Sequence, residues 1–503
     1  MTPPDPVEIE LKTALPSHQV AMFLKLMARR RCVPVQHDLV TRYFDTPDFA
    51  LSAQGIAFRV RKQGRRWLQT LKTEGERQGG LSQRAEYEVV ITRGTPDWKR
   101  FPAEALALVP EALRTQLVPV FETQFHRTAW LLKGQRGVQI EVALDVGEVR
   151  AGKRSQPICE IELELKAGQP DALFVLAQGW AQQLDCVPLD ISKAERGVRL
   201  AHGQAEEPVK SASVALNRDM SVEDGFAAMV QVCLAQFQAN LPGVRASDDI
   251  EYVHQARVAL RRLRAALRLY RRLCVLPDEL MDGLRTLVSA LGPARDWDVL
   301  CTETLPAIAP HYPDANAWQH GFSALASRRA ELRATTQAAL MQAHPGAWLL
   351  AFQRWMLQRG WRTSSETQRL VQLSPLKKWA RRALQKGHRP IVRGARDFGR
   401  LQPVQRHALR IAIKRQRYAT EFFQSLFTKR LQARYQAVLQ ELQDSLGRIN
   451  DASVAKRLLM DDEVDTGPMG PFVLGWLAAQ QANEAKGEIE KQLKSFMKWV
   501  PSW

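Results

Sequence analysis

Charged and apolar residues alternate along the first two fifths of the chain. In Glu8-Ile9-Glu10-Leu11-Lys12 the period is two, which is the spacing of a β-strand, and Glu160-Ile161-Glu162-Leu163-Glu164-Leu165-Lys166 repeats it. Two helices, 17–31 and 170–184, and short helices within 97–118 interrupt the strands. Segments bounded by Gly, Pro or polar turns predict further strands at 38–46, 55–63, 66–74, 84–92, 120–132, 137–149 and 158–166.

The pattern changes to helical periodicity after a polar interval. Residues 203–220 are polar and have no periodicity, and from Ser221 onward long amphipathic runs are rich in Ala, Leu, Arg and Gln. We therefore expect a strand-rich domain at 1–203, a linker at 204–219 and a helical domain at 220–503.

The helical part contains an internal repeat. His254-x-x-Arg257-x-x-x-Arg261-x-x-Arg264 recurs 153 positions later as His407-x-x-Arg410-x-x-x-Lys414-x-x-Arg417. A second block, Leu291-Gly292-x-x-Arg295-Asp296, recurs as Leu446-Gly447-x-x-Asn450-Asp451. Such duplication predicts two similar helical bundles, at about 220–365 and 366–500.

The net charge of the chain indicates what kind of partner it binds. The chain carries +18 at pH 7, of which residues 1–205 contribute +4 and residues 206–503 contribute +14, so a polyanionic partner is expected. Six scattered cysteines form no Cys-x-x-Cys pair and are interpreted as small buried residues in a reducing compartment. The opening residues lack the pattern of a secretory signal, and no apolar run is long enough to span a membrane, so we expect a cytoplasmic protein.

The charged strand faces allow two arrangements. An open sheet would turn them to water, and a closed barrel would turn them into a central tunnel. Any one strand alone favours the open sheet. The full set favours the barrel, because carboxylate pairs on some strands and Arg59-x-Arg61 on another balance each other across a shared interior. Burial of so many charges is tolerable when the signs balance and a metal and an anion complete the pairing.

These residues resemble the CYTH family, also called the triphosphate tunnel metalloenzymes. The resemblance covers about 1–203. It implies an eight-stranded antiparallel β tunnel barrel with flanking helices that acts on triphosphates or other phosphate compounds with Mg²⁺ or Mn²⁺. It rests on an ordered set of motifs: Glu8-x-Glu10-x-Lys12, Tyr43-Phe44-Asp45-Thr46, Arg59-x-Arg61, Thr70-Leu71-Lys72, Glu86-x-Glu88 and Glu160-x-Glu162.

The resemblance and the charge logic together assign roles. Carboxylates are expected to hold divalent cations, and Glu164 ranks below the other acids of its strand because it lies nearer the strand end. Glu8, Glu10 and Lys12 are the expected catalytic residues. The expected metal ligands are Glu8, Glu10, Asp145, Glu160 and Glu162. The expected substrate-binding residues are Lys12, Arg42, Arg59, Arg61, Lys72, Glu86, Glu88, Arg127 and Lys193, with Arg199 a further candidate.

The expected activity is hydrolysis of a phosphoric anhydride. Inorganic triphosphate would be split to diphosphate and phosphate, with a metal-activated water attacking a terminal phosphorus in line. Neither a Gly-rich phosphate loop nor a base-recognition pocket is evident in the sequence. Adenylate cyclase activity, thiamine triphosphatase activity and a non-catalytic module that binds or targets polyphosphate stay open as alternatives.

The repeated helical motif places one sign of charge on one face. His254, Arg257, Arg261, Arg264, Arg268 and Arg271 fall within an arc of roughly 100° on a helical wheel. A solvated face normally mixes signs to gain favourable i,i+4 pairs, so this stripe indicates anion binding. In the second copy Glu421 replaces the equivalent of Arg268.

The doubled motif resembles the CHAD domain, a histidine-containing α-helical domain often found behind a CYTH domain. The resemblance covers about 219–500 and implies an all-α domain that binds inorganic polyphosphate. Delivery of phosphate chains to the barrel, localisation to polyphosphate granules and phosphate sensing stay open as roles for this domain. The resemblance marks His254, Arg257, Arg261, Arg264, Arg268, His407, Arg410, Lys414 and Arg417. Nucleic acid is the weaker alternative partner, because the stripe has no interleaved aromatic residues for stacking bases. Nothing in the sequence indicates an oligomeric state.

Overall fold

The computed structural model describes residues 7–30, 32–363, 365–461, 464–484 and 487–499. The chain forms two compact units. The first comprises residues 1–207 together with 344–360, and the second comprises 208–343 and 361–503.

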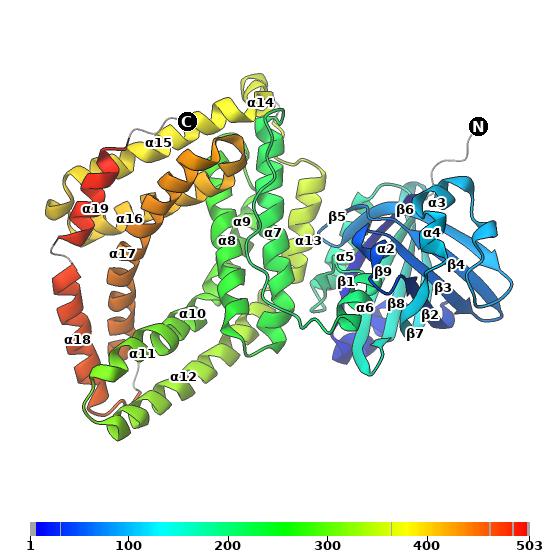
Figure 1. The fold of residues 1–503 in the computed structure, drawn as a ribbon, viewed down its shortest axis with the longest axis horizontal. Helices are drawn as coiled ribbons and strands as arrows, with labels where there is room; N and C mark the ends of the chain where they lie inside the picture. Colours follow the sequence, from blue (N-terminus) through cyan, green and yellow to red (C-terminus); the bar gives the residue numbers. More distant parts are fainter. Residues whose placement is uncertain (1–6, 31, 364, 462–463, 485–486, 500–503) are drawn as a thin grey trace. The chain divides into compact units, whose positions relative to one another are not determined.

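The first unit is a closed, eight-stranded antiparallel barrel (Figure 1), as the alternating charged strands predict. Neighbouring strands follow the order β1-β9-β8-β7-β2-β3-β4-β6, and a pairing between β1 and β6 closes the ring. Short strands β5 (Glu76–Gln78) and β10 (Val187–Pro188) pair with β6 and β1. The barrel strands are β1 (Val7–Ala14), β2 (Val35–Asp45), β3 (Ala57–Gln63), β4 (Arg66–Lys72), β6 (Leu81–Ile91), β7 (Val118–Lys133), β8 (Gln139–Ala151) and β9 (Arg154–Ala167).

The apolar faces of the strands point outward against helices. Leu11 of β1 packs in one cluster with Phe23 and Trp180, and Phe58 and Leu71 pack in another with Phe101. This arrangement leaves the opposite, charged side chains of each strand inside the ring, because side chains alternate along a strand. The covering helices are α1 (Val20–Ala28), α2 (Ala50–Ala53), α3 (Ala103–Leu108), α4 (Glu111–Arg114), α5 (Asp171–Ala181) and α6 (Lys193–Ala201).

One further helix of the first unit comes from far along the chain. Helix α13 (Pro345–Leu357) packs on α5 and β10. Leu350 is fully buried in the same apolar cluster as Leu11. Arg354 donates two hydrogen bonds to the carboxylate of Asp171, at 2.7 and 2.9 Å. The first unit is therefore discontinuous in sequence, and its last helix lies within the range expected for the first helical repeat.

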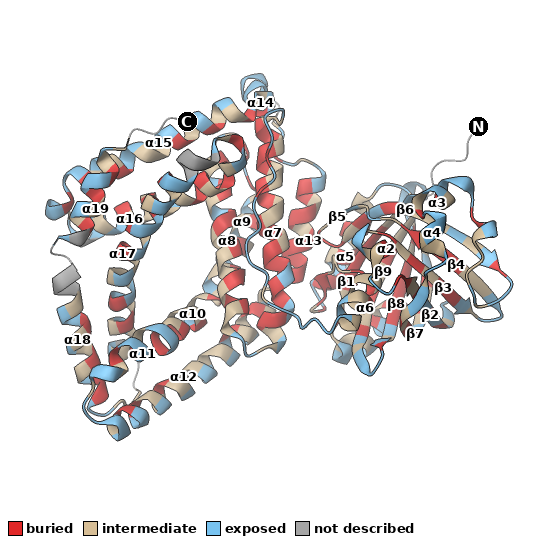
Figure 2. Cartoon of the chain, in the orientation of Figure 1, coloured by how far each residue is buried: buried red, intermediate tan, exposed pale blue. Residues whose placement is uncertain are grey.

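The second unit is helical. Residues 208–216 have no regular structure, yet Val214 and Leu216 are buried in it. The helices are α7 (Val222–Ala246), α8 (Ile250–Tyr270), α9 (Asp278–Ala290), α10 (Gly292–Val299), α11 (Leu305–Ile308), α12 (Ala315–Gln342), α14 (Glu366–Leu373), α15 (Leu376–Arg396), α16 (Pro403–Phe422), α17 (Lys429–Asp461), α18 (Met469–Glu484) and α19 (Glu488–Met497). One apolar cluster, around Trp297 and Met469, packs α10, α11, α12, α17 and α18 together, and another, around Ile413 and Phe496, packs α15, α16, α17 and α19. Figure 2 shows the buried faces of the helices.

Candidate functional site

The barrel encloses a charged cavity of about 460 Å³. Each charged pair of a strand enters it because residues two apart share a face. Both signs are present, and most of the side chains belong to the expected site. The charged residues that line the cavity are Glu8, Glu10, Lys12, Arg59, Arg61, Lys72, Arg84, Glu86, Glu88, Arg127, Glu141, Glu162, Glu164, Lys166 and Lys193.

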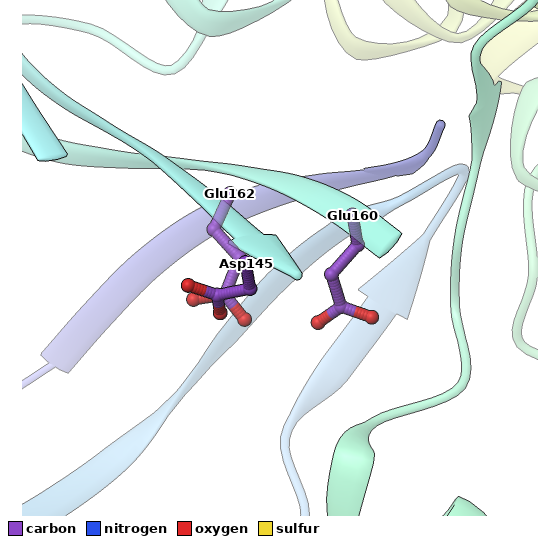
Figure 3. A group of neighbouring side chains, drawn as sticks. All are labelled: Asp145, Glu160 and Glu162. Carbon is purple, nitrogen blue, oxygen red and sulfur yellow. The ribbon is translucent and has the colours of Figure 1, made fainter. Parts of the chain in front are cut away.

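Three carboxylates gather at one wall. Asp145 of β8 pairs in register with Glu160 of β9, and Glu162 follows on the same face. One carboxylate oxygen from each lies within 4.8 Å of the others, and Figure 3 shows the three side chains pointing to the same side of their strands. Asp145 and Glu160 are buried. Such a group of hard oxygen donors suits a divalent cation.

Lys193 and Arg127 supply the positive charge at this wall. Lys193 opens α6, whose N-terminus is capped by Ser192 and Glu195, and this turn directs its ammonium group to Asp145 at 2.7 Å, to Glu162 at 2.8 Å and to Glu160. Burial lowers the pKa of Lys193, but the three carboxylates outweigh it and raise the pKa above its ordinary value. Arg127 donates two hydrogen bonds of 2.7 Å to Asp145 and a further one to Glu162.

Glu8 lies in a second group of ion pairs, which Arg84 joins to Glu10. Lys72 lies 2.8 Å from Glu8 and 2.9 Å from Glu86, and Arg84 lies 3.1 Å from Glu8. Burial raises the pKa of Glu8, but Lys72 and Arg84 outweigh it and hold the pKa well below its usual range. A carboxylate held ionised so firmly is a poor proton acceptor.

Glu10 has less cationic compensation. Its carboxylate lies 3.3 Å from Lys12 and 3.5 Å from Arg84, and its buried Oε2 has no hydrogen-bond partner within the described part of the chain. Burial and the charge of Glu162 raise the pKa of Glu10 to about 7. A further cation beside Glu10 and Glu162 would relieve this repulsion, so the carboxylates present fit a divalent metal ion.

The opposite wall is cationic. Arg59 lies 3.4 Å from Glu86, whereas Arg61 donates to the hydroxyl of Thr41 at 3.1 Å and makes no ion pair within the described ranges. Burial, together with the charges of Arg59 and Arg127, lowers the pKa of Arg61 to about 10. An incoming phosphate group would provide Arg61 with the anion that the protein does not supply.

Four expected residues do not line the cavity: Asp145 and Glu160 are buried behind its lining, whereas Arg42 and Arg199 lie on the surface. Arg42 is exposed and alternates with Thr41 and Tyr43, which point inward, and Arg199 is exposed on α6. Arg42 points away from the cavity because the period of two along β2 places its side chain on the opposite face from Thr41 and Tyr43. Arg42 and Arg199 are therefore left out of the site proposed below.

Arg84 and Arg196 belong to the ion-pair network of the barrel, although neither was predicted as a site residue. Arg84 shares a face with Glu86 and Glu88, so the same periodicity contains the signal for it. Arg196 lies 3.3 Å from Glu160 and is three residues beyond Lys193 on α6. The contact of Arg196 with Glu160 depends on the orientation of α6, which the strand pattern does not predict.

The basic stripe of the second unit lies on α8 and α16, which pack together. Arg257 donates to the carbonyl oxygens of Leu291 and Gly292 at 2.9 and 2.8 Å and lies 3.9 Å from Asp296. Burial lowers the pKa of Arg257, and the charge of Asp296 opposes this effect. In the second copy Asp451 opposes the effect of burial on the pKa of Arg410 in the same way. Both sequence blocks of the repeat thus meet in each copy.

The two copies of the stripe face each other. Burial lowers the pKa of Lys414 to about 8, and the charges of Arg410 and Arg261 add to this effect. The Nε atoms of Arg261 and Arg410 are buried without a hydrogen-bond partner in the described ranges. Donors of this kind are favourable places for phosphate oxygens.

Other stripe residues have partners in the protein. Burial, with Arg295, lowers the pKa of His254, and Arg417 donates to Gln443 at 2.8 Å. Glu421 lies 2.9 Å from the fully buried Arg262, which explains why an acid interrupts the second stripe. His407, Arg264 and Arg268 are exposed.

Among the described helices, none has the length and apolar character that a membrane span requires. Comparison with known proteins assigns the two parts to families. The CYTH domain model matches residues 7–198, and the CHAD domain model matches residues 228–460.

Similar proteins cover each part separately. An inorganic triphosphatase of Haemophilus influenzae is 36% identical over 202 residues, which are 39% of this chain and 56% of that protein. The chain thus spans just over half the length of this relative. The crystal structure of the CHAD domain from Ricinus communis is 30% identical, with a TM-score of 0.52, over 59% of this chain and 99% of that one. The chain therefore belongs to the CHAD-domain family and carries a CYTH domain at residues 7–198.

Proposed function

We propose that the barrel hydrolyses inorganic triphosphate with the help of a divalent metal ion. The observation that carries this proposal is an acidic wall, Asp145, Glu160 and Glu162, of which Glu162 lines the cavity. Cations that include Arg61 line the same cavity from β3, on the opposite side of the ring. The printed activity of the Haemophilus influenzae relative supports it.

The acidic wall and Glu10 would hold Mg²⁺ or Mn²⁺. A bound divalent metal supplies positive charge against the phosphate oxygens and lowers the pKa of a bound water. Lys193 and Arg127 hold the three carboxylates of the wall in place through the short contacts described above.

The cationic wall would hold the substrate. Arg59 and Arg61 clamp phosphate oxygens by bidentate hydrogen bonds, and Lys12 and Lys72 add charge from neighbouring strands. Glu8 then orients Lys72 and Arg84 toward the cavity, since its lowered pKa suits an ion-pair partner better than a base. Glu86 and Glu88 orient Arg59, from which they lie 3.4 and 3.9 Å.

A substrate panel tests this proposal. Phosphate release is measured on the full chain with triphosphate, long-chain polyphosphate, ATP and thiamine triphosphate, with Mg²⁺, Mn²⁺ or EDTA. We expect the highest kcat/KM for triphosphate and no release in EDTA. Cyclic AMP made from ATP would favour a cyclase instead, and preference for thiamine triphosphate would reassign the substrate.

We further propose that the helical unit binds inorganic polyphosphate along the stripe on α8 and α16. Arg261 and Lys414 lie close enough for the charge of Arg261 to lower the pKa of Lys414, and the buried Nε of Arg261 has no hydrogen-bond partner in the described ranges. Both observations support this role. Binding of a polyanion by such a stripe releases counterions and weakens steeply with salt.

Binding of labelled polyphosphate to the full chain tests the second proposal. Arg261→Ala should weaken binding about tenfold and lower the salt slope by about one. Arg285→Ala removes the same charge from an exposed position on α9 and serves as the control. Displacement of polyphosphate by equal amounts of RNA would instead favour a nucleic-acid partner.

A further inference from the structure

A second cavity, of about 680 Å³, lies within the helical unit among α8, α15 and α16. It begins where the stripe of α8 ends. Every charged residue that lines it is basic, and within the described ranges no carboxylate joins them. These residues are Arg268, Arg271, Arg272, Arg382, Lys386 and Arg415.

These six cations share one feature of their surroundings. The structure gives them no ion pair within the described ranges, and all six are exposed at the rim. Partial burial, and then the nearby charges of Arg268 and Arg271, lowers the pKa of Arg415. An external anion at this open cavity would relieve the repulsion among these like charges.

The floor of the cavity is apolar. It consists of small residues on the facing helices, such as Ala383 and Ala412, together with Trp379 and the buried Phe422. At Gly387 the helices approach closely, since a Cβ there would lie 2.0 Å from the side chain of Gln416. The indole of Trp379 is half-buried and lies against Tyr270, with ring centroids 4.3 Å apart.

Inorganic polyphosphate has no apolar group, so it would gain no binding energy from an apolar cavity floor. A cavity of this size, with an apolar lining that includes a half-buried tryptophan and with six exposed cations around it, matches ligands that join an apolar ring to several negative charges. We propose that this cavity binds a nucleoside polyphosphate, with the base against Trp379 and the phosphates at the arginine rim. This site is separate from the barrel and does not depend on the activity proposed there.

Photolabelling locates the site without relying on the barrel. The full chain is irradiated with 8-azido-ATP in EDTA, and the labelled peptides are identified by mass spectrometry. We expect labelled peptides from 376–396 or 403–422, with protection by ATP at concentrations where inorganic triphosphate does not protect. Labelling confined to barrel peptides, or equal protection by triphosphate, would overturn the proposal.

Variants separate the base from the phosphates. Trp379→Ala should weaken ATP binding about tenfold and leave triphosphate binding unchanged. Arg382→Ala with Arg415→Ala, both at exposed positions, should weaken ATP binding about tenfold without affecting the fold. Arg381→Ala, exposed on α15 outside the cavity, is the matched control. Unchanged ATP affinity in the double variant would overturn the proposal even if Trp379→Ala failed to fold.

Discussion

At the scale of single residues, the site depends on side chains that satisfy opposite charges in one buried place. Lys193 lies among Asp145, Glu160 and Glu162, so each carboxylate has a cationic partner although it is largely shielded from water. The sequence identified Lys193 only through a short motif. The capping turn that aims it inward depends on Ser192 and Glu195, whose local signal does not reveal which strands lie opposite.

Replacement of Lys193 tests this balance. Lys193→Met leaves the buried Asp145 and Glu160 and the half-buried Glu162 without their ammonium partner, so we expect a loss of about 3–5 kcal/mol in the free energy of unfolding. Urea denaturation at pH 7 measures the loss. Arg42→Ala, an exposed position outside the cavity, should change it by less than about 0.5 kcal/mol. Equal stability of Lys193→Met and the parent chain would contradict the ion-pair account.

Lys414 makes a pH prediction for the helical unit. Its pKa of about 8 lies below the ordinary value, so the free protein loses this charge as the pH rises through 8. Polyphosphate affinity should therefore fall more steeply between pH 7 and 9 for the parent chain than for Lys414→Arg, which keeps its charge. Fluorescence anisotropy measures both, and parallel curves would exclude Lys414 from the binding surface.

The lowered pKa of Lys414 also has a cost for stability. The charged form is disfavoured in the fold, so the penalty is fully present below about pH 8 and disappears as the pH rises toward the unfolded value. Lys414→Gln should therefore raise the melting temperature at pH 7 while it weakens polyphosphate binding. A lower melting temperature at pH 7 would contradict this reading of the site.

At the scale of elements, strands were far easier to predict than the discontinuous packing. The period of two in β1 and β9 determines which face is charged, and the balance of opposite charges among the strands favours closure of the ring. Helix α13 carries only a general apolar pattern, in Trp348-Leu349-Leu350 and its neighbours. That pattern indicates that α13 is buried but not which element it packs against. The packing of α13 on α5 is seen only in the structure.

Leu350 tests whether α13 is part of the barrel unit. Leu350→Ala should destabilise that unit by about 2–5 kcal/mol, because the side chain is fully buried beside Leu11. Leu357→Ala, on an exposed part of the same helix, is the control. Hydrogen exchange of peptides from β1 and α5 reports the unit directly. Unchanged exchange in Leu350→Ala would contradict the packing described above.

At the scale of the whole molecule, the proposed functions divide the charge of +18 between two kinds of anion chemistry. The barrel balances its cations with carboxylates and would use the remainder on a short phosphate chain. The helical unit leaves cations such as Arg415 and Lys386 without acidic partners in the described ranges and would use them on external anions. Composition alone indicated a polyanionic partner, whereas the separation of enclosed and open sites depends on the fold.

The most direct test of the central claim compares two acids on neighbouring parts of the barrel. Phosphate release from triphosphate with Mg²⁺ or Mn²⁺ is measured for Glu162→Gln and for Glu148→Gln, which lies outside the cavity on β8. We predict a loss of about a hundredfold or more in kcat/KM for Glu162→Gln and parental rates for Glu148→Gln. Parental, metal-dependent rates in Glu162→Gln would contradict the assignment of the acidic wall.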